Sequence, residues 1–166
     1  MKTPLKIEFQ NHSEAVLKKT LLAVSPEEGC ALLVGKEKQL KLNRKEISYQ
    51  ISLIWPCCNI WKPGKTWFQE SNPKNKKSKE IPSKKNRFTI DHNEQLIAQK
   101  WARERKLSIL GSAHSHLSNF SIPSAIDLEW NFSTSLMMIV NKDGLLRAWW
   151  IKNSSVQETI EVPYTA

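Results

Sequence analysis

The sequence predicts one α+β domain. At 166 residues the chain is long enough to bury a single hydrophobic core without disulfides. Helical and strand-like hydrophobic periods occur in the order helix, strands, helix, strand, short helix and strands, and no repeat period appears. This mixed order predicts a sheet with helices packed against it.

The first half of the chain predicts one helix and then several strands. Apolar residues recur at helical spacing over residues 13–24, with Ser13 as a candidate N-cap and Pro26 just beyond the helix end. Three strands are predicted next, the first two as neighbours joined near residues 35–38: 30–35, 39–43 and 46–55.

In the second half, a long loop precedes a helix and further strands. Residues 56–86 are rich in Pro, Lys, Asn and Ser, which predicts a loop that is Lys-rich over about residues 62–86 and mobile over 71–86. Asp91 and Glu94 have capping-box spacing, so a helix is expected from there to about Lys106. A short helix is expected near Ser124, and the remaining predicted strands are 88–90, 107–116, 136–140, 145–151 and 156–162.

Two histidines and an aspartate have the spacing of metal ligands. His114 and His116 lie two apart at the end of the predicted strand 107–116, so both side chains point to the same face. Asp127 follows on the next element, after Ser124. Two nitrogens and one carboxylate are a usual catalytic zinc set with a fourth position open for water.

The segment from His114 to Asp127 resembles the signature of a known family. It reads His-Ser-His, seven residues, Ser, two residues, Asp, which is similar to the JAMM metalloproteases of the MPN (Mov34/PAD-1, JAB1-type) fold. Those proteins also have an upstream glutamate in a stretch similar to Glu-x-Cys-Gly-Leu-Leu-x-Gly. The chain carries such a stretch, which aligns on Cys30 and Gly35. That alignment selects Glu28 over its neighbour Glu27 as the family's glutamate.

The resemblance implies a fold and an activity. The fold would be a cytidine-deaminase-like curved mixed sheet flanked by helices, in one compact prokaryotic-type domain over residues 1–166. One zinc ion per chain would be held by His114, His116 and Asp127. Glu28 would be the general acid/base, and Ser124 would donate a hydrogen bond to the oxyanion. The implied hydrolase is a metallopeptidase or isopeptidase that cuts an amide bond, with the C-terminal tail of a ubiquitin-like or sulfur-carrier protein as the expected substrate.

Two departures from the family pattern leave alternatives open. Ala31 stands where many members have glycine, and Leu117 stands where most have proline. Because proline restricts the backbone, Leu117 is expected to loosen the loop that carries Ser124 and Asp127. A catalytically silent MPN-fold domain that binds partners is therefore the second interpretation. Ser124 also reads as a plain helix cap, and Glu28 as an ordinary surface carboxylate.

The charge balance raises the question of a partner. The formal net charge is +9, from 25 Lys and Arg against 16 Asp and Glu. Much of the excess is concentrated in one stretch: Lys74, Lys76, Lys77, Lys79, Lys84, Lys85 and Arg87. It reads as a solvated loop, as a site for an acidic protein, or as a nucleic-acid site, the last being least favoured because the run lacks aromatic stacking platforms. Trp61 and Trp67 in the loop are expected to be exposed and are candidates for substrate contact.

The cysteine count and hydropathy indicate a cytoplasmic protein. Three cysteines are an odd number, and no signal-peptide-like segment is seen, which favours a reducing compartment. No apolar run approaches the roughly 18–20 residues that span a bilayer, so no membrane association is expected. The sequence leaves the oligomeric state open.

Overall fold

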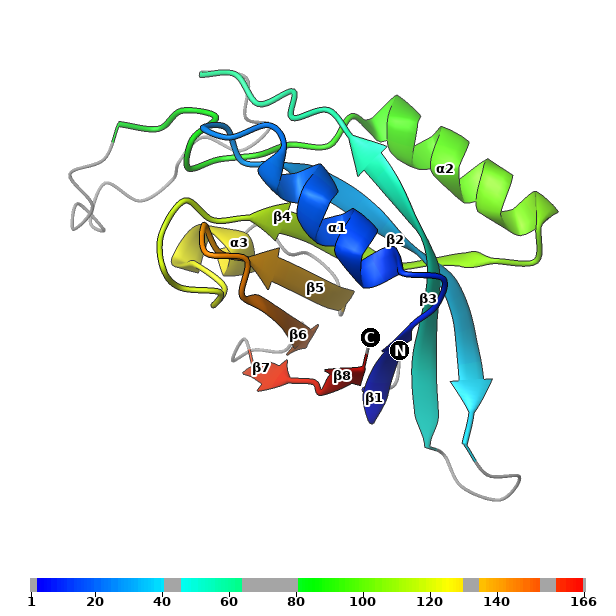
Figure 1. The fold of residues 1–166 in the computed structure, drawn as a ribbon. Coiled ribbons are helices and arrows are strands. Elements are labelled where there is room, and N and C mark those ends of the chain that lie inside the picture. The colour runs from blue at the N-terminus through cyan, green and yellow to red at the C-terminus, as the bar shows by residue number, and fades with distance from the viewer. Residues whose placement is uncertain (1–2, 41–45, 64–80, 130–134, 153–157, 166) are drawn as a thin grey trace.

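An eight-stranded mixed sheet with three helices organises the part of the chain that the computed structural model describes, residues 3–40, 46–63, 81–129, 135–152 and 158–165 (Figure 1). In chain order the elements are β1 (Lys6–Phe9), α1 (Ser13–Leu22), β2 (Cys30–Gln39), β3 (Ile47–Cys57), α2 (His92–Glu104), β4 (Ser108–Ser115), α3 (Ala125–Glu129), β5 (Ser135–Val140), β6 (Leu146–Lys152), β7 (Glu158–Glu161) and β8 (Tyr164–Thr165). Among the described residues, each helix is too short or too polar to cross a membrane.

The sheet curls until its two ends are linked by the C-terminal segment. The strand order is β7-β6-β5-β4-β2-β3-β1-β8, with parallel pairing of β1 with β3, β1 with β8 and β4 with β5. The Val162 N–H donates to the Ala148 carbonyl at 2.9 Å, and the Ile7 N–H donates to the Pro163 carbonyl at 2.9 Å. Val162 therefore bonds to β6, near one end of the sheet, and Pro163 bonds to β1, near the other end. Figure 1 shows β7 and β8 following one another along this segment. The expected curved mixed sheet is confirmed.

The two faces of the sheet carry different helices. Ala31 and Leu33 of β2 belong to the main hydrophobic core with Leu17 and Leu21 of α1. The alternating residues of the same strand, Cys30 and Leu32, form a second buried cluster with Ala98 of α2. On the same face as α2, Leu128 of α3 packs with Met137 and Ile139 of β5. Because side chains alternate along a strand, α1 covers one face while α2 and α3 cover the other.

One predicted turn is wrong. The expected pair of strands over 30–35 and 39–43 is a single strand through Gln39, and residues 41–45 lie outside the described part. A register shift at Val34/Gly35 replaces the turn. A Cβ on Gly35 would lie 1.8 Å from the Gln50 carbonyl oxygen, so glycine serves here for the close approach of β3.

Two strands had no sequence signal. β1 has four residues and β8 has two, and each joins its neighbour in parallel across a long stretch of chain. Such short segments show too few alternations to be recognised, and their pairing depends on the closed sheet.

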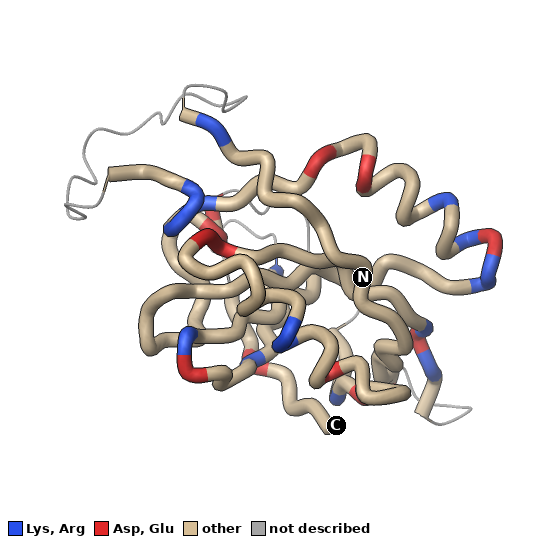
Figure 2. Tube along the Cα trace, turned by 45° about the horizontal axis from the view of Figure 1, so that its top comes forward, with Lys and Arg blue, Asp and Glu red and all other residues tan. Residues whose placement is uncertain are grey.

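The caps of α2 agree in part with the predicted capping box. Asp91 is the N-cap, and its carboxylate accepts a hydrogen bond from the Asn93 N–H at 2.8 Å. The Glu94 carboxylate accepts instead from the Cys58 N–H at 3.4 Å, which links the helix to the end of β3. Acidic Glu94 in the first turn and basic Arg103 in the last suit the helix dipole. Figure 2 colours acidic and basic residues along the described chain, and both kinds occur on the helix at the right of that view.

Candidate metal centre

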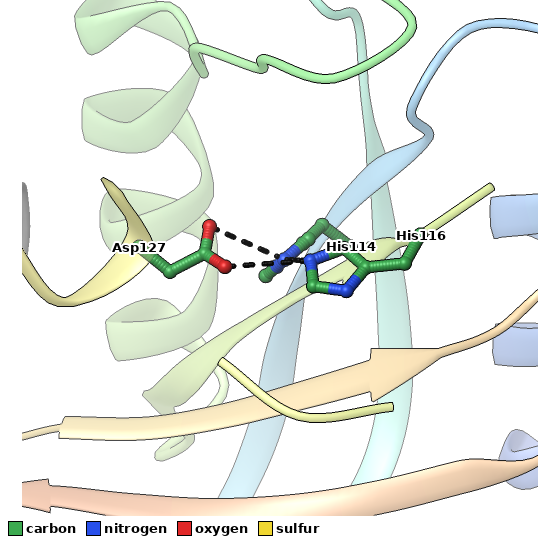
Figure 3. Close-up of side chains that lie close together, drawn as sticks. All are labelled: His114, His116 and Asp127. Atoms are coloured by element: carbon green, nitrogen blue, oxygen red, sulfur yellow. Dashed lines mark hydrogen bonds and ion pairs between the residues drawn. The ribbon is translucent and has the colours of Figure 1, made fainter. Parts of the chain in front are cut away.

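Two neighbouring elements bring the predicted ligands together. His114 lies on β4, where it pairs with Ile139 of the neighbouring strand β5. His116 follows one residue after β4, where its backbone N–H donates to the Val140 carbonyl at 2.8 Å. Asp127 comes from α3, on the same face of the sheet. Figure 3 shows the Asp127 carboxylate directed at both imidazole rings.

The separations of the ligand atoms suit a tetrahedral metal. His114 Nε2 lies 3.4 Å from Asp127 Oδ1, and His116 Nε2 lies 3.3 Å from Asp127 Oδ2. The two Nε2 atoms are 2.9 Å apart. Zinc bonds of about 2.0–2.1 Å arranged tetrahedrally require ligand atoms about 3.3–3.4 Å apart. The cluster therefore fits such an ion with a small widening between the rings, and it can bind a metal whose identity the geometry leaves open.

Electrostatics keeps the aspartate ionised. Burial opposes the charge of Asp127, but the charge of His114 and hydrogen bonds from His114, His116 and Ser124 outweigh it and hold the Asp127 pKa far below its usual value. For His116, burial lowers the pKa, and the hydrogen bond and charge of Asp127 outweigh that and raise it. The metal-free site thus binds protons that a metal ion must displace, so metal affinity should rise with pH.

Ser124 and Asp127 form the predicted capping box. The Ser124 N–H donates to Asp127 Oδ2 at 2.7 Å, and the Asp127 N–H donates to Ser124 Oγ at 3.2 Å. The cap therefore also orients the carboxylate toward the histidines. Ser124 Oγ is an acceptor in this pair, and the Ser124 hydroxyl also bonds to the Asp127 carboxylate, which contributes to the lowered Asp127 pKa.

Glu28 lies beside the ligands on the same face of the sheet. The Ser115 N–H donates to the Gly29 carbonyl at 3.0 Å, and the Gly29 N–H donates to Ser115 Oγ at 2.8 Å. This register sets Glu28 opposite His116, as Cys30 is opposite His114. Glu28 is 7% exposed, and the charges that act on its carboxyl group are those of His116, Asp127 and Arg87.

The environments of the two adjacent glutamates differ sharply. Burial raises the pKa of Glu28 to about 8, with the charge of His116 opposing the shift. Glu27 is exposed and pairs with Lys84 at 3.5 Å. Of the two, only Glu28 has the buried, proton-binding carboxylate that acid/base work requires. Its role as the acid/base stays a prediction.

Glu28 is expected to lower the stability of the metal-free protein at neutral pH. Its pKa is about 8 in the folded state against 4.5 for the ordinary group, so its favourable contribution is present below about pH 4.5 and is lost as pH rises through about 8. Glu28→Gln should raise the free energy of unfolding by on the order of 2–4 kcal/mol above about pH 8 and change it little near pH 4. Urea denaturation with chelator at both pH values measures this, and superimposable curves at the higher pH would contradict it.

Gly29 allows β2 to lie against α1. A Cβ there would meet the Leu21 carbonyl oxygen at 2.3 Å and the Leu21 Cα at 2.8 Å, both backbone atoms that cannot rotate away. Gly29→Ala should therefore cost about 1–3 kcal/mol of unfolding free energy through overpacking, measured by chemical denaturation. Gly144→Ala is the control, since its Cβ meets nothing within 4 Å and only its φ of +83° is unfavourable. A larger loss at Gly144 than at Gly29 would contradict the steric argument.

The loop after His116 is held by the β5–β6 hairpin despite the departure at Leu117. Ser121 Oγ donates to the Leu145 carbonyl at 2.6 Å, and Trp149 Nε1 donates to the Ser121 carbonyl at 2.8 Å. Asn141 Nδ2 donates to the Asn119 carbonyl at 2.7 Å. These bonds tether the loop from residues more than 20 positions away, and the loosening expected from Leu117 stays a prediction. No local pattern indicated these bonds.

The remaining predicted site residues lie in the long loop. Trp61 is 6% exposed, so the expectation that it is exposed is wrong; its ring joins the interior beside Pro26 and Pro82. Trp67 and the basic residues within 64–80 lie outside the described residues, and the mobility of that stretch stays a prediction. Residues 81–86 form a turn in which the Ser83 N–H donates to Asn86 Oδ1 at 2.9 Å.

Two residues beside the site were missed in the sequence. Phe88 stacks on His114 with ring centroids 4.5 Å apart and an interplanar angle of 25°. Asn59 bonds to the backbone of Glu28 and of the segment that carries Phe88. Phe88 had appeared only as part of a brief strand, and Asn59 lay within a loop-like composition. Neither contact has a motif that could have indicated it.

Comparison with known proteins agrees with this geometry. The family model described as prokaryotic homologs of the JAB domain matches residues 11–152. The fold is similar to the solution structure of DSY2949 from Desulfitobacterium hafniense, with a TM-score of 0.69, 19% identity and coverage of 96% of this chain and 92% of that one. The fold is also similar to a solution structure of a protein from Salinibacter ruber, with a TM-score of 0.55, 18% identity and coverage of 95% of this chain and 91% of that one.

Two further results complete the comparison. The crystal structure of AF2198, a JAB1/MPN domain protein from Archaeoglobus fulgidus, gives a TM-score of 0.48 and 14% identity, with coverage of 99% of this chain and 100% of that one. No curated protein matches the chain. The match over residues 11–152 spans most of the sequence, including all three candidate ligands and Glu28. The chain belongs to the prokaryotic homologues of the JAB domain.

Proposed function

We propose that this protein is a zinc-dependent metallopeptidase or isopeptidase that hydrolyses an amide bond. The observation that carries the proposal is the joint placement of the His114, His116 and Asp127 ligand atoms, within 4.8 Å of one another, on the sheet face that also holds the buried Glu28. When bound there, zinc supplies a Lewis acid and lowers the pKa of a coordinated water toward about 7.

The chain's own residues supply the proton transfer. Glu28 accepts a proton on its carboxylate from the attacking water and passes it to the nitrogen of the leaving amine. Burial raises its pKa to about 8 in the metal-free protein, which brings this carboxyl into the range where proton uptake and release both occur near neutral pH. With 7% of its surface exposed, Glu28 is largely shielded from bulk water.

Ser124 is suited to stabilise the oxyanion. Its Oγ accepts the Asp127 N–H at 3.2 Å and its hydroxyl lies beside the Asp127 carboxylate, from which it would turn its proton to a substrate oxygen when substrate binds. Such a donor contributes roughly 3 kcal/mol in comparable sites. Capping and oxyanion donation are compatible roles of the same hydroxyl.

The proposed substrate is the C-terminal tail of a ubiquitin-like or sulfur-carrier protein in the cytoplasm. Family resemblance supports this class, and the three free cysteines agree with a reducing compartment. The basic stretch offers an attraction for an acidic carrier, with Lys84, Lys85 and Arg87 as its described part.

Metal content and cleavage test the proposal in turn. Purified protein should bind about one zinc ion per chain, measured by elemental analysis. Candidate carrier proteins extended at the C-terminus are then incubated with the zinc-loaded protein, and mass spectrometry should detect cleavage within the tail. Protein that binds zinc but leaves every extended carrier intact would favour the partner-binding interpretation, whereas absence of zinc binding would reject the metal centre itself.

A further inference from the structure

The side chain of Asn59, just beyond β3, joins three separate stretches of backbone. Asn59 Nδ2 donates to the Glu28 carbonyl at 3.1 Å and to the Arg87 carbonyl at 2.9 Å. Its Oδ1 accepts from the Trp61 N–H at 3.1 Å and the Thr89 N–H at 3.2 Å. Both donors and both acceptor positions of the amide are thus used. The opposite amide orientation would direct an oxygen at two carbonyl oxygens, so the network itself determines the orientation.

Two of these backbone stretches lead directly to the candidate centre. One carries Glu28. The other carries Phe88, whose ring stacks on His114 and whose two neighbours in the chain, Arg87 and Thr89, are both bonded to Asn59. A metal-binding histidine is usually oriented by a hydrogen bond to its second ring nitrogen. His114 Nδ1 is buried and has no such partner among the described residues, so the stacked Phe88 ring takes over this orienting contact.

The segment around Phe88 packs against a buried cluster that includes Cys30, Leu32 and Ile90, and it has few bonds to regular strands. It is linked to the end of β3 by a single bridge between Asn59 and Ile90 and by the Ile60 N–H, which donates to the Thr89 carbonyl at 3.0 Å. It belongs to no regular strand. Besides this packing, the Asn59 amide holds the backbone on both sides of Phe88 and so helps to set the position of the ring.

We propose that Asn59 is a positioning residue that holds the Glu28 backbone and, through the Phe88 ring, the His114 imidazole in the arrangement that binds the metal. The inference rests on the proposed function for its biological meaning. Its physical content, the effect of Asn59 on zinc binding and on the local backbone, is measurable with zinc alone.

A double-mutant cycle on the full chain tests the transmission through Phe88. Asn59→Ala and Phe88→Leu should each weaken zinc binding by roughly 10-fold, measured by competition with a chromophoric chelator. If Asn59 acts on His114 through Phe88, the double variant should be weaker by about the same factor rather than by about 100-fold. The cobalt-substituted single variants should also share the same change in their visible absorption spectrum, which reports ligand geometry.

Three further variants separate positioning from general stability. Ser13→Ala removes a buried hydrogen bond of 3.0 Å to the Ile51 carbonyl, on the α1 side of the sheet, and should leave zinc affinity unchanged. Phe88→Tyr keeps the stacked ring and should bind zinc nearly as wild type does. Asn59→Asp keeps the two acceptors but loses both donors, so it should weaken zinc binding and provides the test if Asn59→Ala does not fold.

The Glu28 half of the proposal has its own measurement. The Glu28 N–H donates to the Lys84 carbonyl at 2.7 Å, and loss of the Asn59 bond to the Glu28 carbonyl should loosen this strand end. Amide hydrogen exchange of Glu28 should therefore be about 10-fold faster in Asn59→Ala than in Ser13→Ala.

Each outcome bears on one proposal or the other. Wild-type zinc affinity in both Asn59 variants, or fully additive losses in the double variant, would overturn the inference while leaving the metal centre standing. A wild-type protein that binds no zinc would reject the proposed function, and the positioning role with it.

Discussion

Glu28→Gln should abolish cleavage while the protein keeps its zinc. Glutamine has nearly the same shape but cannot accept the proton of the attacking water, so the rate should fall by about 10²–10⁴-fold, the usual contribution of a general acid/base. Zinc content should remain at about one ion per chain because Glu28 is not among the ligand atoms that cluster together. The measurement pairs elemental analysis with the rate of tail cleavage observed by mass spectrometry.

The neighbouring residue provides the matched control. Glu27→Gln removes the same charge one position away, but Glu27 is exposed and paired with Lys84, so its rate should stay close to wild type. The reverse result, an active Glu28→Gln and an inactive Glu27→Gln, would show that the register between β2 and β4 does not select the acid/base. Equal activity of both variants would remove the glutamate from the mechanism.

His116→Ala should lose both the metal and the activity. The substitution leaves one nitrogen and one carboxylate, too few protein ligands for a stable zinc site, and it removes the 3.3 Å contact that helps to direct the Asp127 carboxylate. Zinc retained after dialysis should fall from about one ion per chain to near zero. Cleavage should then be undetectable at zinc concentrations that saturate the wild-type protein.

An exposed histidine elsewhere on the chain controls for nonspecific metal binding. His92 begins α2, lies outside the cluster, and its replacement by alanine should change neither zinc content nor rate. Full zinc occupancy in His116→Ala would mean that the ion is bound by other residues, and the proposed centre would have to be abandoned. Loss of zinc in both variants would point to histidine-dependent adsorption instead.

The three candidate ligands were predictable because their spacing along the chain is a local feature of the sequence. His114 and His116 lie two residues apart at the end of β4 and so share a face, and Asp127 follows Ser124 at capping-box spacing, so their directions follow from local backbone geometry. The helices and most strands were predictable for the same reason, since hydrophobic period is a local property. The turn predicted near Gly35 was wrong because a glycine that permits close strand approach looks the same in sequence as one that permits a turn.

By itself, the sequence determined the α+β class, the three candidate ligands and the choice of Glu28 by alignment. Only the tertiary structure decided what surrounds them: the closure of the sheet through Val162 and Pro163, and the Asn59 and Phe88 contacts. The burial that raises the Glu28 pKa was decided there too. The physical reason is distance along the chain. Burial and pairing between residues far apart in the sequence depend on the packing of the whole sheet, and no local period or spacing encodes them.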